Sequence, residues 1–195
     1  MAHNKKYTVA FKRKLSKKTD YRKRLDLIKS RKLRLVIRPH LNNMILQIVE
    51  FNPGGDHVLI TITSKQLVSY GWNYHRGNMP SAYLTGLLLG KKAHEKKIYE
   101  AILDIGLNSG VKASRIYAVL KGAVDAGLKI PYSEEVLPKD EIVQGKAIVE
   151  YDSLLQKNKD IHDKQFSNYI KNKINIEDLP KVFNQVKNKI LGKEK

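Results

Sequence analysis

The amino-acid sequence predicts an α/β fold: a mixed sheet with a βββ-α-β-α core, preceded by a basic N-terminal arm and followed by a helical C-terminal extension. Three short runs rich in β-branched residues come before two segments with the apolar spacing of helices. The net charge of +18 is concentrated near the N-terminus. We therefore divide the chain into an arm (1–18), an α/β body (19–130) and a mainly helical extension (131–195).

Positive charge separates the N-terminal region from the rest of the chain. Residues 1–38 contain 15 Lys and Arg residues and two Asp residues, a net charge of +13. Residues 39–130 carry a net charge of +4 and residues 131–195 carry +1. The body and the extension are therefore ordinary in charge, and the N-terminal region is the part of the chain suited to a polyanion.

The arm alternates basic residues with aromatic and aliphatic ones, and few of its residues punctuate secondary structure. We expect it to be mobile in isolation and to become ordered on a partner. Thr19 and Asp20 predict the N-terminal cap of a helix that continues to about residue 28. Tyr21 and Leu25 share the apolar face of this helix, which leaves its cations free to project outward.

The three strand-like runs lie at residues 33–38, 44–51 and 58–63. Turn-forming residues separate them, so we expect an antiparallel meander. A short helix is predicted at 64–70. A long helix then begins near Pro80, a residue favoured in the first turn. Its apolar stripe is predicted to comprise Leu84, Leu87, Leu88, Ile98 and Ala101.

The second half of the body continues with a short apolar run at 102–107, which predicts a fourth strand. A helix is expected from Ser114, and Gly127 is placed to cap its C-terminus. Residues 131–138 are predicted to be irregular. The extension should then contain helices at about 140–156 and 161–172, with a last helix that opens near Asn175.

Several functional classes find no support in the sequence. There is no cysteine, and the six histidines lack metal-ligand spacing, so we expect no metal site and no cofactor. The segment 86–92 has glycines and lysines but not the spacing of a phosphate loop, and helix packing is the better explanation of its glycines. Asp104 and Asp125 could be imagined as paired catalytic acids, but capping or salt bridging is the better interpretation. No apolar run is long enough to span a membrane.

The charge of the N-terminal region favours RNA as the partner. A solvated tail is the plain alternative, yet 13 excess positive charges within 38 residues repel one another unless a polyanion is present. A cationic segment without fixed structure can follow RNA grooves and gain affinity by releasing condensed counterions. A membrane surface is a weaker candidate, because the arm lacks a sustained apolar face.

The loop at residues 71–78 combines aromatic rings, an arginine, amides and glycines, a set typical of sites for unpaired nucleotides. For Trp72, core packing and RNA contact are equally supported by the residues alone. For Arg76 and Asn78, contact with RNA is favoured, because polar groups beside glycine are usually exposed.

Five sequence blocks are similar to those of a known family. They are KTDYRKRL at 18–25, YGW at 70–72, GNMPSAYLTG at 77–86, LKGAVDAG at 120–127 and KQFSNYIK at 164–171. The chain resembles the archaeal and eukaryotic branch of the 5S-rRNA-binding ribosomal protein, the eighteenth of the large subunit in unified naming. The last block is similar to the long C-terminal extension that bacterial members lack.

The resemblance implies a non-catalytic protein of the central protuberance in the cytoplasmic large ribosomal subunit. It implies binding to 5S rRNA, with contacts to large-subunit rRNA and to neighbouring ribosomal proteins, and it implies no membrane partner and no small-molecule substrate. It also implies RNA contacts for the arm, for residues 19–24 and for residues 71–78. With the basic residues of this region, the candidate RNA-binding set is Lys12, Arg13, Lys14, Lys17, Lys18, Thr19, Tyr21, Arg22, Lys23, Arg24, Arg31, Trp72, Tyr74, Arg76 and Asn78.

Two rival functions share the basic arm. An RNA-processing enzyme would need a convergent cluster of acids, histidines or metal ligands, and the sequence shows none. A free RNA chaperone would bind many RNAs with similar affinity. Competition between 5S rRNA and an unrelated structured RNA separates the chaperone from a dedicated 5S-binding protein.

Overall fold

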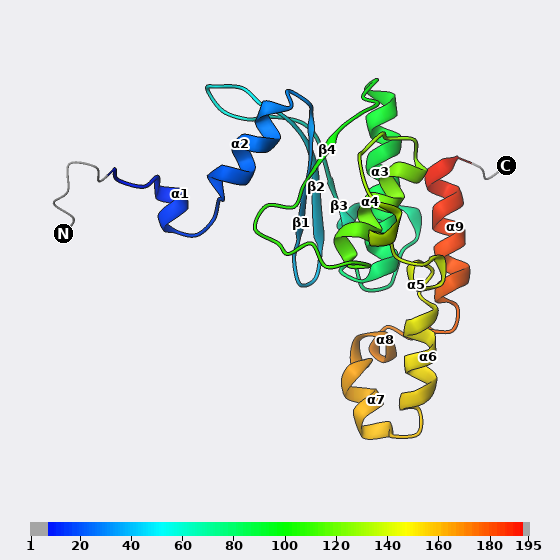
Figure 1. Cartoon of the computed structure of the whole chain (residues 1–195). Coiled ribbons are helices and arrows are strands. Elements are labelled where there is room, and N and C mark those ends of the chain that lie inside the picture. Colours follow the sequence, from blue (N-terminus) through cyan, green and yellow to red (C-terminus); the bar gives the residue numbers. More distant parts are fainter. Residues whose placement is uncertain (1–7, 193–195) are drawn as a thin grey trace.

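The structure is a computed structural model that describes residues 8–192. A four-stranded mixed sheet forms its centre, in the order β3-β2-β1-β4 (Figure 1). The first three strands form the predicted antiparallel meander, and β4 lies parallel to β1. The strands are β1 (Arg34–Pro39), β2 (Met44–Glu50), β3 (His57–Thr63) and β4 (Ile102–Asp104). The predicted α/β class is confirmed.

Two helices, α3 (Met79–Glu95) and α4 (Arg115–Asp125), cover one face of this sheet. They approach closely because glycine lies at both contact points. A Cβ atom at Gly86 would overlap the backbone carbonyl of Val119, and one at Gly122 would overlap that of Tyr83. The glycines of segment 86–92 therefore serve helix packing, as predicted, and not phosphate binding.

The long helix α3 ends earlier than predicted. Its last residue is Glu95, and Lys97 follows in the left-handed region at a φ of 57°. Ile98 and Ala101 therefore lie outside the helix, although both still pack against the core. The fourth strand is also shorter than predicted, because Gly106 turns the chain at a φ of 62°. Gly127 adopts a φ of 97° just after α4, where the cap was expected.

The C-terminal region contains more and shorter helices than predicted. The expected helix at 140–156 is divided by Gly145, which has a φ of 87°, and the last helix begins at Leu179 rather than near Asn175. These elements are α5 (Asp140–Val143), α6 (Lys146–Leu155), α7 (Lys159–Gln165), α8 (Ser167–Lys171) and α9 (Leu179–Leu191). There are two 3₁₀ helices in the described residues: η1 (Ser64–Tyr70) in the body and η2 (Glu134–Val136) at the start of the extension.

The last helix returns to the body. Leu179, Phe183, Val186 and Ile190 of α9 are buried in the same hydrophobic core as the sheet and α3. Helices α6 to α8 project below this core (Figure 1). The described part of the extension therefore has two parts: helices α6 to α8, which project from the core, and helix α9, which completes it.

Candidate nucleic-acid interface

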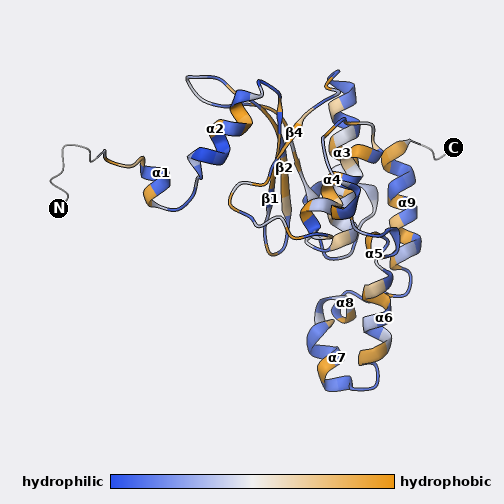
Figure 2. Cartoon of the chain, viewed as in Figure 1, coloured by the Kyte–Doolittle hydropathy of each residue, from blue (hydrophilic) through white to orange (hydrophobic). Residues whose placement is uncertain are grey.

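The N-terminal helices lie outside the hydrophobic core. Helix α1 (Lys12–Leu15) and helix α2 (Tyr21–Lys29) contain no buried residue. Their residues are mainly hydrophilic, with a few hydrophobic positions between them (Figure 2). Val9, Phe11 and Leu15 are each about two-thirds exposed or more, at 73%, 68% and 66%. The surface therefore presents single apolar side chains among its cations. The first seven residues of the predicted arm lie outside the described residues.

Most of the predicted cations of this region are free of acidic partners. Within residues 8–192, no carboxylate lies within ion-pair distance of seven exposed members of the candidate set. These are Lys12, Lys14, Lys17, Lys18, Arg22, Lys23 and Arg31. Arg13 is also exposed, and its Nε donates a hydrogen bond of 2.9 Å to Thr19 Oγ1. The structure thus leaves the charge of this surface uncompensated, which favours an anionic partner.

The start of α2 is fixed by the predicted cap. Asp20 Oδ1 accepts hydrogen bonds from the backbone N–H groups of Arg22 (3.0 Å) and Lys23 (3.3 Å). The cap satisfies two amides at the helix N-terminus. The ring of Tyr21 packs against Phe11, with 5.0 Å between ring centroids, so the arm folds back against α2 at this point.

Arg24 differs from its neighbours because it binds the body of the protein. Its guanidinium pairs with Asp56, on the connection between β2 and β3, at 2.9 Å. Among the described residues, this is the one side-chain hydrogen bond that joins α2 to the α/β body. Arg24 therefore positions α2, and in this conformation its charge is neutralised by Asp56.

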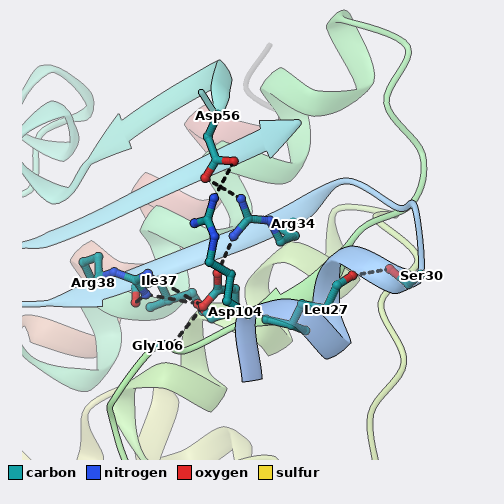
Figure 3. A network of polar contacts seen from close by, with 9 residues as sticks. Leu27, Ser30, Arg34, Ile37, Arg38, Asp56, Asp104 and Gly106 are labelled. Carbon is teal, nitrogen blue, oxygen red and sulfur yellow. Dashed lines mark hydrogen bonds and ion pairs between the residues drawn. The ribbon is translucent and has the colours of Figure 1, made fainter. Parts of the chain in front are cut away.

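Asp56 belongs to a polar network that also includes side chains of β1 and β4 (Figure 3). Arg34, only 3% exposed, donates to Asp56 (2.6 Å) and to Asp104 (3.0 Å), and Arg38 lies 3.6 Å from Asp104. Burial of Asp56 opposes its ionisation, but the hydrogen bonds from Arg24 and Arg34 outweigh burial and lower the pKa of this carboxyl. Asp56 is therefore held as a carboxylate, and the network fixes the attachment point of α2.

Two aromatic residues of the candidate RNA-binding set, Trp72 and Tyr74, lie in the protein interior. Trp72 is 0% exposed and Tyr74 is 6% exposed, and their rings pack together at 5.3 Å. The Tyr74 hydroxyl donates to the backbone carbonyl of Asn175 at 2.7 Å. These rings face the protein interior because the extension covers them, so neither can stack on a nucleotide without rearrangement.

The polar residues of the loop have different roles. Asn78 caps α3, since its Oδ1 accepts from the backbone N–H of Ser81 at 3.0 Å. Arg76 is partly exposed and has no ion-pair or hydrogen-bond partner in the described part of the chain. Burial, followed by the positive charges of Arg115 and Arg76, lowers the pKa of His75. The local potential at this loop is therefore positive.

The acids of the body have structural partners. Asp104 pairs with Arg34 and Arg38, and Asp125 accepts a 2.6 Å hydrogen bond from the Tyr83 hydroxyl. The predicted salt bridging is confirmed for Asp104, whereas Asp125 binds a tyrosine hydroxyl instead of a cation or a helix end. Residues 8–192 contain no group of three His, Asp or Glu side chains placed to hold a metal ion. No helix in the same range has the length and apolar character needed to cross a membrane.

Comparison with known families gives one match. The model of a family described as ribosomal large subunit proteins 60S L5 and 50S L18 matches residues 5–99 and, in a second segment, residues 91–133. Together these segments span more than half of the 195 residues. They include α1 and α2, all four strands, and helices α3 and α4.

Proposed function

Because the chain belongs to the family of ribosomal large subunit proteins 60S L5 and 50S L18, we propose that it is a non-catalytic structural constituent of the large subunit that binds 5S rRNA. In this role it helps to attach 5S rRNA to the large-subunit rRNA in the central protuberance. Its further partners are neighbouring ribosomal proteins, and it acts in the cytoplasm as part of the large subunit.

The observation that carries this proposal is the exposed cationic surface of α1 and α2. The surface buries none of its side chains, leaves most of its cations unpaired within the described residues, and is joined to the body through Arg24 and Asp56. Phosphate groups that bind such a surface displace condensed counterions, which provides affinity without reading sequence. We therefore assign most of the binding energy to this N-terminal surface, formed by the arm and α2.

Preference for one RNA needs a second feature, because counterion release does not distinguish sequences. A fixed orientation of α2 against the sheet would supply it, since RNA is recognised largely through the placement of groups on a folded shape. The Arg24–Asp56 ion pair gives α2 a defined attachment point. We therefore assign phosphate binding to the free cations and the choice of RNA to the body and the orientation of α2.

Deletion of residues 1–18 tests the first half of this division. The shortened protein should melt cooperatively at nearly the temperature of the full chain, because the described residues of the arm bury almost no surface. Its affinity for 5S rRNA in filter binding should fall by at least about a hundredfold at moderate salt, since five or more phosphate contacts are lost. Competition by an unrelated structured RNA provides the control. Unchanged affinity, or equal binding of both RNAs by the full chain, would contradict the proposal.

A further inference from the structure

A cavity of about 850 Å³ lies between the loop at residues 72–76 and the projecting helices α6 to α8. Its volume falls within the range of small-molecule sites. The β1–β2 turn contributes Asn42 to one side, and α6 contributes Ile148 and Tyr151 to another. The cavity is therefore built by segments from the body and from the C-terminal extension together.

One wall of the cavity consists of aromatic rings. Tyr74 packs on Tyr169 at 5.8 Å between centroids, Tyr169 on Phe166 at 6.0 Å, and Phe166 on Tyr151 at 6.1 Å. The Tyr169 hydroxyl accepts a 3.0 Å hydrogen bond from the backbone N–H of His75, which ties α8 to the loop. Tyr151 is 44% exposed, so its ring is available to a planar ligand. The buried rings of Tyr74 and Phe166 support this wall, and Tyr151 is its exposed stacking ring.

Amide side chains line the rest of the cavity. Asn42, Asn73, Gln165 and Asn168 are exposed lining residues, and their side chains have no hydrogen-bond partner within the described residues. Each amide offers both donors and an acceptor. A ligand with donors and acceptors around a planar ring could satisfy several of them.

The charges around the cavity select the class of ligand. No Asp or Glu is among the lining residues, whereas Arg76 lines the cavity without a partner in the described chain. Arg115, which lies close to His75, is bound to the backbone carbonyl of Gly77 at 2.7 Å. Asp178, whose charge adds to burial in raising the pKa of Tyr74, is paired with Lys181 at 3.0 Å. These charges favour a negatively charged ligand over a peptide that contains few acidic residues.

We propose that this cavity receives an unpaired nucleotide of RNA. The base stacks on the wall at Tyr151, the free amides bind its edge, and Arg76 pairs with a phosphate. This inference rests on the proposed function, because it adds a nucleotide site to an RNA-binding protein. The loop at residues 71–78 would then contact RNA through Arg76. Its buried rings, Trp72 and Tyr74, would not stack on a base.

Photocrosslinking tests the site. A short thiouridine oligonucleotide is bound to the full-length protein, at a salt concentration that suppresses counterion-driven binding by the arm, and is then irradiated. Mass spectrometry should find crosslinks within residues 72–76 or 147–169. The sole tryptophan, Trp72, is among the residues that line the cavity and packs on Tyr74, so its fluorescence should change on binding of the same oligonucleotide. Crosslinks confined to residues 1–38 would overturn the proposal.

Variants make the test specific. Tyr151→Leu removes the exposed ring, and Asn168→Leu removes an exposed amide; each should weaken oligonucleotide binding, by about tenfold for the ring. Leu154→Ala, on the same helix but outside the lining, is the matched control and should bind as the unaltered protein does. Equal binding by all four proteins would exclude the cavity as the site.

The two proposals fail in different ways. If 5S rRNA is preferred over other RNA but the cavity yields no crosslink, the nucleotide site is wrong and the proposed function stands. If the cavity crosslinks but 5S rRNA is not preferred, the site stands and the proposed function is wrong. Binding of an uncharged peptide in place of the oligonucleotide would show the cavity to be a protein-docking site and would overturn the inference.

Discussion

At the scale of single residues, Asp56 connects two arginines with different environments. Arg34 is almost fully buried and pairs with both Asp56 and Asp104, whereas Arg24 is partly exposed on α2 and pairs with Asp56. A buried guanidinium that loses a carboxylate keeps its desolvation penalty, but an exposed pair contributes little. Asp56 should therefore stabilise the body mainly through Arg34 and orient α2 through Arg24.

Replacement of each partner separates these two effects. Asp56→Asn should lower the free energy of unfolding by about 1 to 3 kcal/mol, a value reduced for the partial exposure of Asp56. Arg24→Gln should lower it by no more than about 1 kcal/mol, but amide exchange in α2 should become faster. Urea denaturation and hydrogen exchange measure both quantities. Lys29→Gln, which breaks an exposed pair within α2, is the control. Equal losses for Asp56→Asn and Arg24→Gln would contradict this assignment.

His162 couples the projecting helices to pH. Its Nε2 lies 2.9 Å from Asp152, and its Nδ1 lies 3.3 Å from Asp163. The hydrogen bonds to Asp152 and then Asp163 raise the pKa of His162, because only the protonated ring donates to both acids. A raised pKa in the folded state stabilises the protein below the ordinary value of about 6.5, and this contribution disappears as pH rises through the folded pKa.

The stability of His162→Gln relative to the unaltered protein should therefore depend on pH. We expect a clear difference in melting temperature near pH 5.5 and a smaller one near pH 8.5, about one unit below and two units above the ordinary pKa of histidine. Scanning calorimetry of both proteins measures it, and the difference between them cancels the titration of other groups. A difference that grows with pH would show that the neutral ring is the stabilising form.

The loop shows where residue types alone are insufficient for prediction. Trp72 and Tyr74 have the side chains of a stacking site, yet both rings are buried under the extension. Burial here depends on residues about 100 positions later in the chain, such as Asn175, which accepts from Tyr74. The local sequence carries no signal for this contact. The cap formed by Asp20, in contrast, is local and was predictable.

At the scale of elements, the strands were predictable because each is a run rich in β-branched residues, and short segments of turn-forming residues separate the runs. Each of the first three strands lies within one residue or so of its predicted bounds. Helix ends were less predictable. Helices α1, α2, α3 and α8 are each followed by a Lys or Arg at positive φ, where glycine is the usual signal. The break between α5 and α6 requires glycine at position 145, because a Cβ atom on residue 145 would overlap the side chain of Leu179.

The last helix should be necessary for the stability of the body. Phe183 of α9 is 2% exposed and packs on Tyr83 of α3 at 5.5 Å between ring centroids. Phe183→Ala should lower the free energy of unfolding by about 3 to 5 kcal/mol, a large share of the total for a domain of ordinary stability. The matched change Gln185→Ala, on the exposed side of α9, should have an effect within about 0.5 kcal/mol. Chemical denaturation measures these losses. Two separate unfolding transitions, of which Phe183→Ala shifts only one, would show that α9 folds independently of the body.

At the scale of the whole molecule, charge and core occupy different parts of the chain. The core joins the sheet to α3, α4 and α9, and the surplus positive charge lies on residues outside it. The charge asymmetry could be read directly from the sequence, and it favoured RNA as the partner, whereas the ribosomal function came from the resemblance of the five sequence blocks. The sequence could not show which cations are free, because the pairing of Arg24 with Asp56 joins residues 32 positions apart.

The salt dependence of binding to 5S rRNA tests the central claim, that the free N-terminal cations bind RNA phosphates while the body selects the RNA. For the full chain, the slope of log affinity against log salt should be on the order of −5 to −7, if roughly half of the 15 basic residues before Pro39 neutralise phosphates. A fourfold variant replaces exposed, unpaired cations of α1 and α2 with Gln: Lys12, Lys14, Arg22 and Lys23. A control variant loses the same charge from exposed positions elsewhere: Lys65, Lys129, Lys139 and Lys189.

The first variant should have a slope shallower by up to about 4 and should keep most of its preference for 5S rRNA over an unrelated structured RNA. The control variant should change the slope by less than about 1. Equal changes in slope for both variants would contradict the account, because they would show that net charge, and not the N-terminal surface, determines binding.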